Sequence, residues 1–105
     1  MPGELAELLA ARSGECLDLH AAYVNPQMVR VLRTIGFDRD WTRAEGAYLY
    51  DRDGAKYLDW LGGFGMYNVG RNNPRVRAAL AEALELDLPG KLALGVNPLG
   101  AILAD

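Results

Sequence analysis

The chain has 105 residues, 50% of them hydrophobic, so it can form one modest domain and is too short for two. Its formal net charge of −3 gives no electrostatic reason to expect nucleic acid or an anionic membrane as a partner. A single cysteine excludes an internal disulfide, a single histidine excludes a Cys/His zinc site, and no apolar run reaches signal-peptide or membrane-span length. We therefore expect a cytoplasmic protein without a metal, a membrane or a nucleic-acid partner.

The first predicted helix covers residues 2–12. Its apolar residues recur at helical spacing: Leu5, Leu8 and Leu9. Pro2 lies in its first turn and Gly14 follows its end, which are the usual places for these two residue types. The pattern predicts a short amphipathic helix.

A second helix is predicted to begin at Asn25-Pro26 and to end at Gly36. Asparagine can cap the first turn, and proline has the backbone angle of a first helical residue. Between the two helices we expect a linker that holds Cys16 and His20. Neither is a catalytic candidate, because acidic residues adjoin the thiol and the histidine lacks a nucleophile with an orienting carboxylate.

Aromatic and aliphatic runs at residues 48–50 and 57–61 have strand length and flank Asp53-Gly54. An Asp-Gly pair between such runs is a strong β-hairpin signal, since both central residues of a type I′ turn have positive φ. We predict a hairpin over residues 47–61 with its turn at this pair. A third strand, if present, is expected near residues 67–69.

Residues 62–70 contain four glycines and two aromatic residues, which indicate a loop that ordinary packing does not require. A dinucleotide-binding fingerprint is excluded, because the position of its third glycine is Asn68. A calcium loop that starts at Asp51 is also excluded, because its twelfth position is Gly62 instead of glutamate.

Two more helices are predicted after this loop. Asn73-Pro74 starts a helix that runs to about Leu86 and carries an apolar stripe. Asn97-Pro98 starts the last helix by the same device. That helix is short and no element follows it, so we expect the chain to be truncated.

Residues 46–80 resemble the N-terminal signature of class-III aminotransferases, the group that includes the ornithine, 4-aminobutyrate, acetylornithine and putrescine enzymes. The signature is a glycine, a strand that ends in Asp, an Asp-Gly turn, a Tyr-Leu-Asp strand, a small-residue loop, and Gly-His-x-His-Pro at a helix start. The segment at residues 23–26 and the segment from Asn97 also resemble the family layout. The departure is Gly70-Arg71-Asn72-Asn73-Pro74, which replaces both histidines.

The resemblance implies an α+β segment, with helices around a small antiparallel hairpin, from the N-terminal part of a fold-type I transferase that depends on pyridoxal phosphate. Residues 1–45 would be an N-terminal helical arm, and residues 46–105 the hairpin, glycine-rich loop and helices of the small domain. The Schiff-base lysine of the family lies beyond the matched region, and neither Lys56 nor Lys91 occupies that position. The cofactor is therefore not expected to bind this chain covalently, no residue here is assigned as catalytic, and the cofactor-binding residues stay unassigned.

The resemblance also implies a substrate-binding role for Phe64, Gly65, Met66 and Tyr67. The substrates would be an amino donor and a keto acid or aldehyde, and the full-length enzyme would be a homodimer. A purely structural alternative is that the loop aromatics cap a small sheet. Two other functions stay open: a non-catalytic interaction module or remnant, and a pyridoxal-phosphate aminomutase or epimerase of the same fold.

Overall fold

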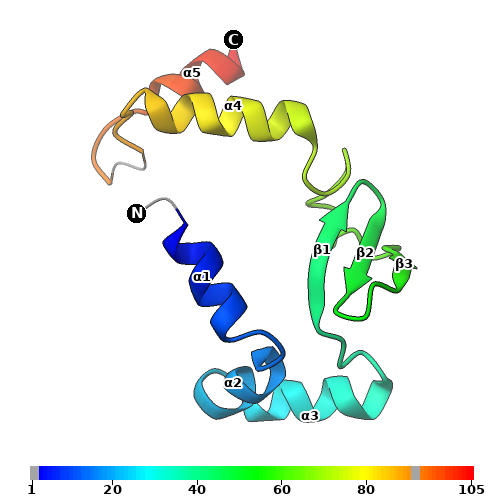
Figure 1. Ribbon diagram of the computed structural model, residues 1–105. Coiled ribbons are helices and arrows are strands. Elements are labelled where there is room, and N and C mark those ends of the chain that lie inside the picture. The colour runs from blue at the N-terminus through cyan, green and yellow to red at the C-terminus, as the bar shows by residue number, and fades with distance from the viewer. Residues whose placement is uncertain (1–2, 91–92) are drawn as a thin grey trace. The chain divides into compact units, whose positions relative to one another are not determined.

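The computed structural model describes residues 3–90 and 93–105 (Figure 1). They divide after Arg71 into two compact units. The first unit holds three helices and a three-stranded antiparallel sheet, and the second holds two helices. The mixed α+β class predicted from the sequence is confirmed, with three strands where the sequence predicted a two-stranded hairpin.

Helix α1 (Glu4–Ala11) matches the first predicted helix. Glu4 and Glu7 lie in its first turn, where a carboxylate interacts favourably with the helix dipole. The predicted role of Pro2 lies outside the described residues. All three leucines of its apolar stripe are exposed, so α1 presents an uncovered hydrophobic face.

Helix α2 (Cys16–Tyr23) occupies the segment that the sequence predicted to be a linker, so that prediction was wrong. Within the described part of the chain no side chain caps its first turn, and its apolar residues do not form one clear stripe. The helix instead packs along α3 (Pro26–Ile35). Tertiary packing rather than a local signal therefore stabilises α2.

Helix α3 has the ends that its sequence predicts. The Asn25 side chain accepts a hydrogen bond from the backbone N–H of Met28 at 2.9 Å, and Gly36 ends the helix in the left-handed region with φ of 75°. On its inner face lies Val29, at 1% exposure the one fully buried hydrophobic side chain among the described residues. The small core of the first unit thus lies between α2 and α3.

The sheet has the order β1 (Trp41–Glu45), β2 (Tyr48–Asp51) and β3 (Lys56–Leu58). The third strand precedes the hairpin, so the prediction of a strand near residues 67–69 was wrong, and that segment forms turns. A register shift between Trp41 and Arg43 breaks the alternation of β1, which explains why its sequence lacked a strand pattern.

The hairpin of β2 and β3 is confirmed, but its turn differs from the predicted one. The loop has three residues, 52–54, and Gly54 alone has positive φ, at 83°. Its N–H donates to the Asp51 carbonyl at 3.0 Å, and Asp51 N–H donates to Ala55. This is a three-residue loop that ends in a left-handed glycine, so the predicted two-residue type I′ turn was wrong.

The second unit holds α4 (Pro74–Glu85) and α5 (Pro98–Ala104), as the sequence predicted. Asn73 caps α4 by accepting hydrogen bonds from the N–H groups of Arg75 and Val76. Asn97 caps α5 in the same way through Leu99. No helix among the described residues is long and apolar enough to cross a membrane.

Candidate functional site

The glycine-rich loop of residues 62–70 is closed at its base by the Asp59 carboxylate. Asp59 follows β3, and its backbone N–H donates to the Ala47 carbonyl at 2.8 Å. Its Oδ1 accepts the N–H of Gly62 at 3.0 Å, and its Oδ2 accepts Nε of Arg71 at 2.7 Å. One carboxylate therefore binds both the beginning of the loop and the residue that follows its end.

This ion pair is the most enclosed of those found among the described residues, with 8% of the Asp59 side chain and 21% of the Arg71 side chain exposed. The Arg71 hydrogen bond, aided by the Gly62 N–H and opposed by burial, lowers the pKa of Asp59 below its ordinary value of 3.8. Asp59 is thus a carboxylate at neutral pH, and its charge is neutralised by Arg71.

The backbone of Arg71 is held as firmly as its side chain. It pairs with Gly46 in both directions, with N–H to carbonyl distances of 3.0 and 2.8 Å, and so attaches the end of the loop to the turn between β1 and β2. A Cβ on Gly70 would lie 3.0 Å from the Gly46 Cα, so the paired backbone would have to shift by a few tenths of an ångström to admit it. The close approach favours glycine at position 70.

The predicted substrate-binding residues lie on this loop in different environments. Phe64 is 92% exposed and lines a cavity of about 450 Å³, whereas Met66 is exposed without lining it. The Tyr67 ring is 40% exposed: it lies over Gly63, and the Arg71 guanidinium stacks on it at 4.0 Å from the ring centroid. Of the residues named from the sequence, Phe64 alone lines this cavity, and Gly65 adopts φ of 93° beside it.

The other walls of this cavity come from residues that the sequence analysis did not select. They are Phe37, Trp41, Leu49, Tyr57, Leu58, Asp59, Trp60, Leu61, Gly63 and Arg71. Trp41 and Tyr57 meet edge to face at 5.2 Å between ring centroids. The cavity is thus mainly lined by aromatic residues and leucines, with one neutralised ion pair at its edge, and suits an apolar group better than a charged one.

Asp51 organises the hairpin turn next to this cavity. It is 7% exposed, and its carboxylate accepts hydrogen bonds from Asp53 N–H, Ala55 N–H and the Tyr57 hydroxyl. Burial raises the pKa of Asp51, but these three hydrogen bonds outweigh it and the net pKa is lowered. The hydrogen bond from the Tyr57 hydroxyl to the Asp51 carboxylate raises the pKa of Tyr57 above its ordinary value of 10.0. The wall residue Tyr57 is therefore held in place by a charged acceptor.

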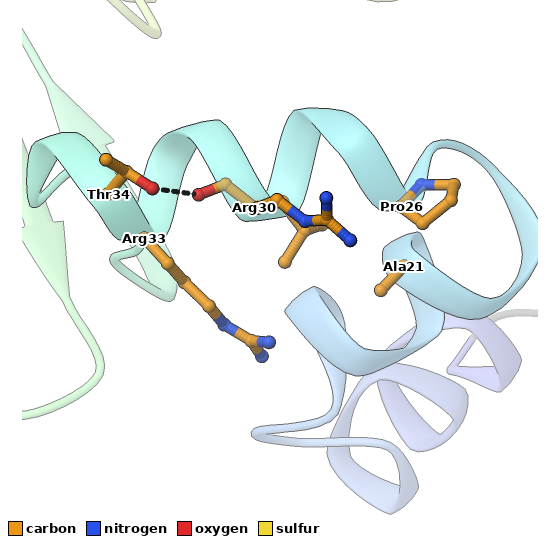
Figure 2. A pocket seen from close by; sticks show the side chains of 6 residues that line it. Ala21, Pro26, Arg30, Arg33 and Thr34 are labelled. Carbon is orange, nitrogen blue, oxygen red and sulfur yellow. Dashed lines mark hydrogen bonds between the residues drawn. The ribbon is translucent and has the colours of Figure 1, made fainter.

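A second cavity, of about 490 Å³, lies against α2 and α3 (Figure 2). Arg30 and Arg33 reach toward it from α3, and Ala21 borders it from α2. Arg33 is paired with Asp18 at 3.1 Å, and the Thr34 hydroxyl donates to the helix carbonyl of Arg30. Both charged side chains are exposed to solvent, so this surface resembles an ordinary polar helix face.

Comparison with known proteins places this arrangement in a family. The model of the class-III aminotransferases matches residues 33–88, which include the sheet, the glycine-rich loop and α4. The chain belongs to the class-III aminotransferase family. An alignment of 85 residues is 41% identical to glutamate-1-semialdehyde 2,1-aminomutase of Deinococcus radiodurans and covers 76% of this chain. The chain spans 19% of that relative's length.

Class-III aminotransferases use pyridoxal phosphate and act on amino and keto substrates, and family membership implies fold type I. The one lysine among the described residues is engaged with an aromatic ring of the sheet. Lys56 projects from the hairpin, and its ammonium lies 3.8 Å from the centroid of the Tyr48 ring. The other lysine, Lys91, lies outside the described residues. Among the described residues, no lysine amine is placed to form the Schiff base with the cofactor.

Proposed function

We propose that this chain is the N-terminal part of a class-III enzyme that depends on pyridoxal phosphate. In this proposal residues 1–45 form an N-terminal arm, helical except for β1 at its end, and residues 46–105 belong to the small domain. The enzyme transfers an amino group from an amino acid or amine to a keto acid or aldehyde. This chain contributes a wall of the substrate pocket, through Phe64, Gly65, Met66 and Tyr67, and contacts between the subunits of a homodimer.

The conformation of Phe64 is the observation that carries this proposal. Its φ of 56° lies in the left-handed region, which costs a residue with a Cβ about 1 kcal/mol. Its ring is 92% exposed, so the chain regains nothing by packing it. A strained, uncovered aromatic side chain at the edge of a cavity is expected where the ring serves a ligand or a neighbouring surface.

Uncovered apolar surface elsewhere supports the view that more structure surrounds these residues in the working protein. Trp60 is 88% exposed beside the loop, and the apolar stripe of α4 is open at Val76, Leu80 and Leu84. Contiguous exposed apolar surface is uncommon on a free-standing domain and typical of an interface. These faces are where we place the contacts with the remainder of the enzyme.

The test begins with the reading frame beyond the codon for Asp105 and the intact mass of the native product. We expect a protein several times longer than 105 residues. In that protein Phe64→Ala should raise KM for the amino donor and leave the amount of bound cofactor unchanged. A native product of 11.5 kDa would exclude transamination by this chain and favour a non-catalytic interaction module.

A second candidate is an aminomutase, favoured by the 41% identity to glutamate-1-semialdehyde 2,1-aminomutase. An aminomutase moves the amino group within one molecule and so needs no separate keto acceptor. Incubation of the enzyme with a single amino aldehyde distinguishes the two reactions. Continued turnover without an added keto acid indicates the mutase, whereas one half-reaction that stops indicates the transferase.

A further inference from the structure

We propose that Arg71 is a positioning residue that closes the glycine-rich loop and thereby sets the direction of Phe64. It acts with Asp59 and Tyr67, and we call these three residues the loop clamp. Its importance for substrate binding rests on the function proposed above for Phe64. The closure of the loop itself rests on contacts within the first unit alone.

The first part of the argument is that Arg71 makes three separate contacts at one point. Its Nε donates to Asp59 at 2.7 Å, its guanidinium lies 4.0 Å from the centroid of the Tyr67 ring, and its backbone pairs with Gly46. These contacts join the end of β3, the middle of the loop and the turn between β1 and β2. Few side chains other than arginine can pair with a carboxylate and stack on a ring together.

The second part is that the loop itself offers little resistance to movement. Gly62, Gly63, Gly65 and Gly70 all have positive φ, between 51° and 93°, and glycine retains the most freedom in an unfolded chain. Its internal hydrogen bonds are short-range turns, such as Phe64 N–H to Leu61 and Tyr67 N–H to Gly62. The fixed geometry therefore depends on the groups that join its ends.

The third part links the clamp to Phe64. Tyr67 is held between the Arg71 guanidinium and Gly63, where a Cβ would lie 2.6 Å from its ring. Phe64 is the next residue after Gly63, so the held ring fixes the backbone on which Phe64 stands. Release of Arg71 frees Tyr67, and the left-handed strain at Phe64 can then relax.

The experiment measures amide hydrogen exchange by NMR on the full chain. In Arg71→Ala we expect protection of the Gly62, Phe64 and Tyr67 amides to fall at least about tenfold, with the amides between β2 and β3 unchanged. Asp59→Asn should act in the same direction. The matched control is Arg43→Ala, because Arg43 also pairs with a carboxylate, Glu45, and stacks on a ring, Tyr50, away from the loop.

A second variant tests the loop clamp even if the Arg71→Ala substitution weakens the whole fold. The Arg71→His imidazole can form an ion pair with Asp59 only while it is protonated, because the neutral ring keeps a single N–H for a weaker hydrogen bond, and Asp59 and Tyr67 are the groups that face it. Protection of the loop should be stronger at about pH 5 than at about pH 8 in this variant, and should be constant across that range in the wild type. The pairing raises the histidine pKa, so closure is strongest at low pH and weakens as pH rises through it.

Loop protection equal to that of the wild type in Arg71→Ala, or independent of pH in Arg71→His, would overturn the clamp. Neither result would bear on the proposed function, which is tested by KM in Phe64→Ala. Conversely, a normal KM in Phe64→Ala alongside a loop loosened by Arg71→Ala would refute the pocket role and leave the clamp standing.

Discussion

Asp59 and Arg71 are twelve positions apart in the chain, yet Oδ2 of the first lies 2.7 Å from Nε of the second. All the residues of the glycine-rich loop lie between them. The same carboxylate binds Gly62 through its other oxygen. The pair is therefore the base on which the candidate substrate wall stands, and it makes definite predictions about acid, backbone changes and the aromatic ring.

The variant Asp51→Asn removes the acid-sensitive carboxylate of the hairpin, so in this variant acidification should open the glycine-rich loop before it unfolds the hairpin. In Asp59→Asn the opening of the loop should not depend on acidification. The pKa of Asp59 is lowered on folding, so its stabilisation is full above the unfolded value of 3.8 and declines as pH falls below it toward the folded value. NMR titration of the Gly62 amide measures this. A Gly62 signal that does not change below pH 3.8 would contradict the pairing.

Removal of the Tyr57 hydroxyl in Tyr57→Phe should raise the pKa of Asp51 and leave that of Asp59 unchanged. The hydroxyl is one of three donors to the Asp51 carboxylate, and without it the effect of burial is less opposed. The contribution of the Asp51 carboxylate to hairpin stability, which is present above the unfolded value of 3.8 and lost as pH falls toward the folded value, is then smaller than in the wild type. Carboxyl-carbon NMR shifts follow both groups in one titration, and an unshifted Asp51 would contradict the expected result.

Gly70→Ala should destabilise the loop more than Gly65→Ala does. Both glycines have left-handed φ, of 86° and 93°, so each substitution costs about 1 kcal/mol from the backbone alone. Only at Gly70 does the new Cβ meet a backbone atom, Gly46 Cα at 3.0 Å, whereas nothing lies within 4 Å at Gly65. Denaturant unfolding of the two variants gives the comparison, and equal losses would show that the close approach is not restrictive.

Asn25→Ala should lower the stability of α3 by about 1 kcal/mol, because Asn25 caps its first turn through Met28 N–H. Gln27→Ala is the control, since it alters an exposed side chain in the same turn without a cap. Thermal unfolding followed by circular dichroism should show a lower midpoint for the first variant only. Equal midpoints would mean that packing against α2 outweighs the cap.

Phe64→Asn should leave the fold as stable as the wild type or more stable, and weaken substrate binding. Asparagine enters the left-handed region more readily than phenylalanine, so the strain at this φ of 56° decreases. Leu86→Asn replaces another exposed apolar residue, which belongs to the second unit, and is the control. A fall in stability comparable to that of a buried residue would show that the ring packs within the protein after all.

The elements that carry their own local signals were predicted from the sequence. The helices that begin at Pro26, Pro74 and Pro98 each follow an asparagine whose side chain caps the first turn. The hairpin follows from its aromatic runs. In each case the residues that determine the structure are neighbours in the chain, so the local sequence is enough to predict the element.

Elements stabilised by distant contacts were missed for the corresponding reason. Helix α2 depends on α3, and β1 depends on pairing with β2 through a register shift that hides its alternation. The two-residue turn was wrong because the Asp51 carboxylate binds Asp53 and Ala55 and favours a longer loop. The turn preference of the Asp-Gly pair does not show that the Asp51 carboxylate binds these two N–H groups.

The loop was predicted in outline, because its glycines mark it, whereas the binding role of its aromatic residues stays a prediction. Both Asp59 and Arg71 belong to the segment that resembles the family: Asp59 ends the Tyr-Leu-Asp strand, and Arg71 is part of the departure from the histidine pattern. Their partnership was missed, although two opposite charges that flank a glycine-rich stretch are a signal of loop closure. Tyr67 was grouped with Phe64, and its separate position is explained by the stacking on Arg71.

The loop clamp constrains the length of the glycine-rich loop but not the identity of its exposed side chains. The span between Asp59 and Arg71 is set by two hydrogen bonds and a backbone pairing, so an inserted or deleted residue would break the closure. The exposed side chains of Phe64 and Met66 are not part of that closure. Under the function proposed above, a library that varies these two positions at constant loop length would alter substrate selectivity while the closed loop stays unchanged.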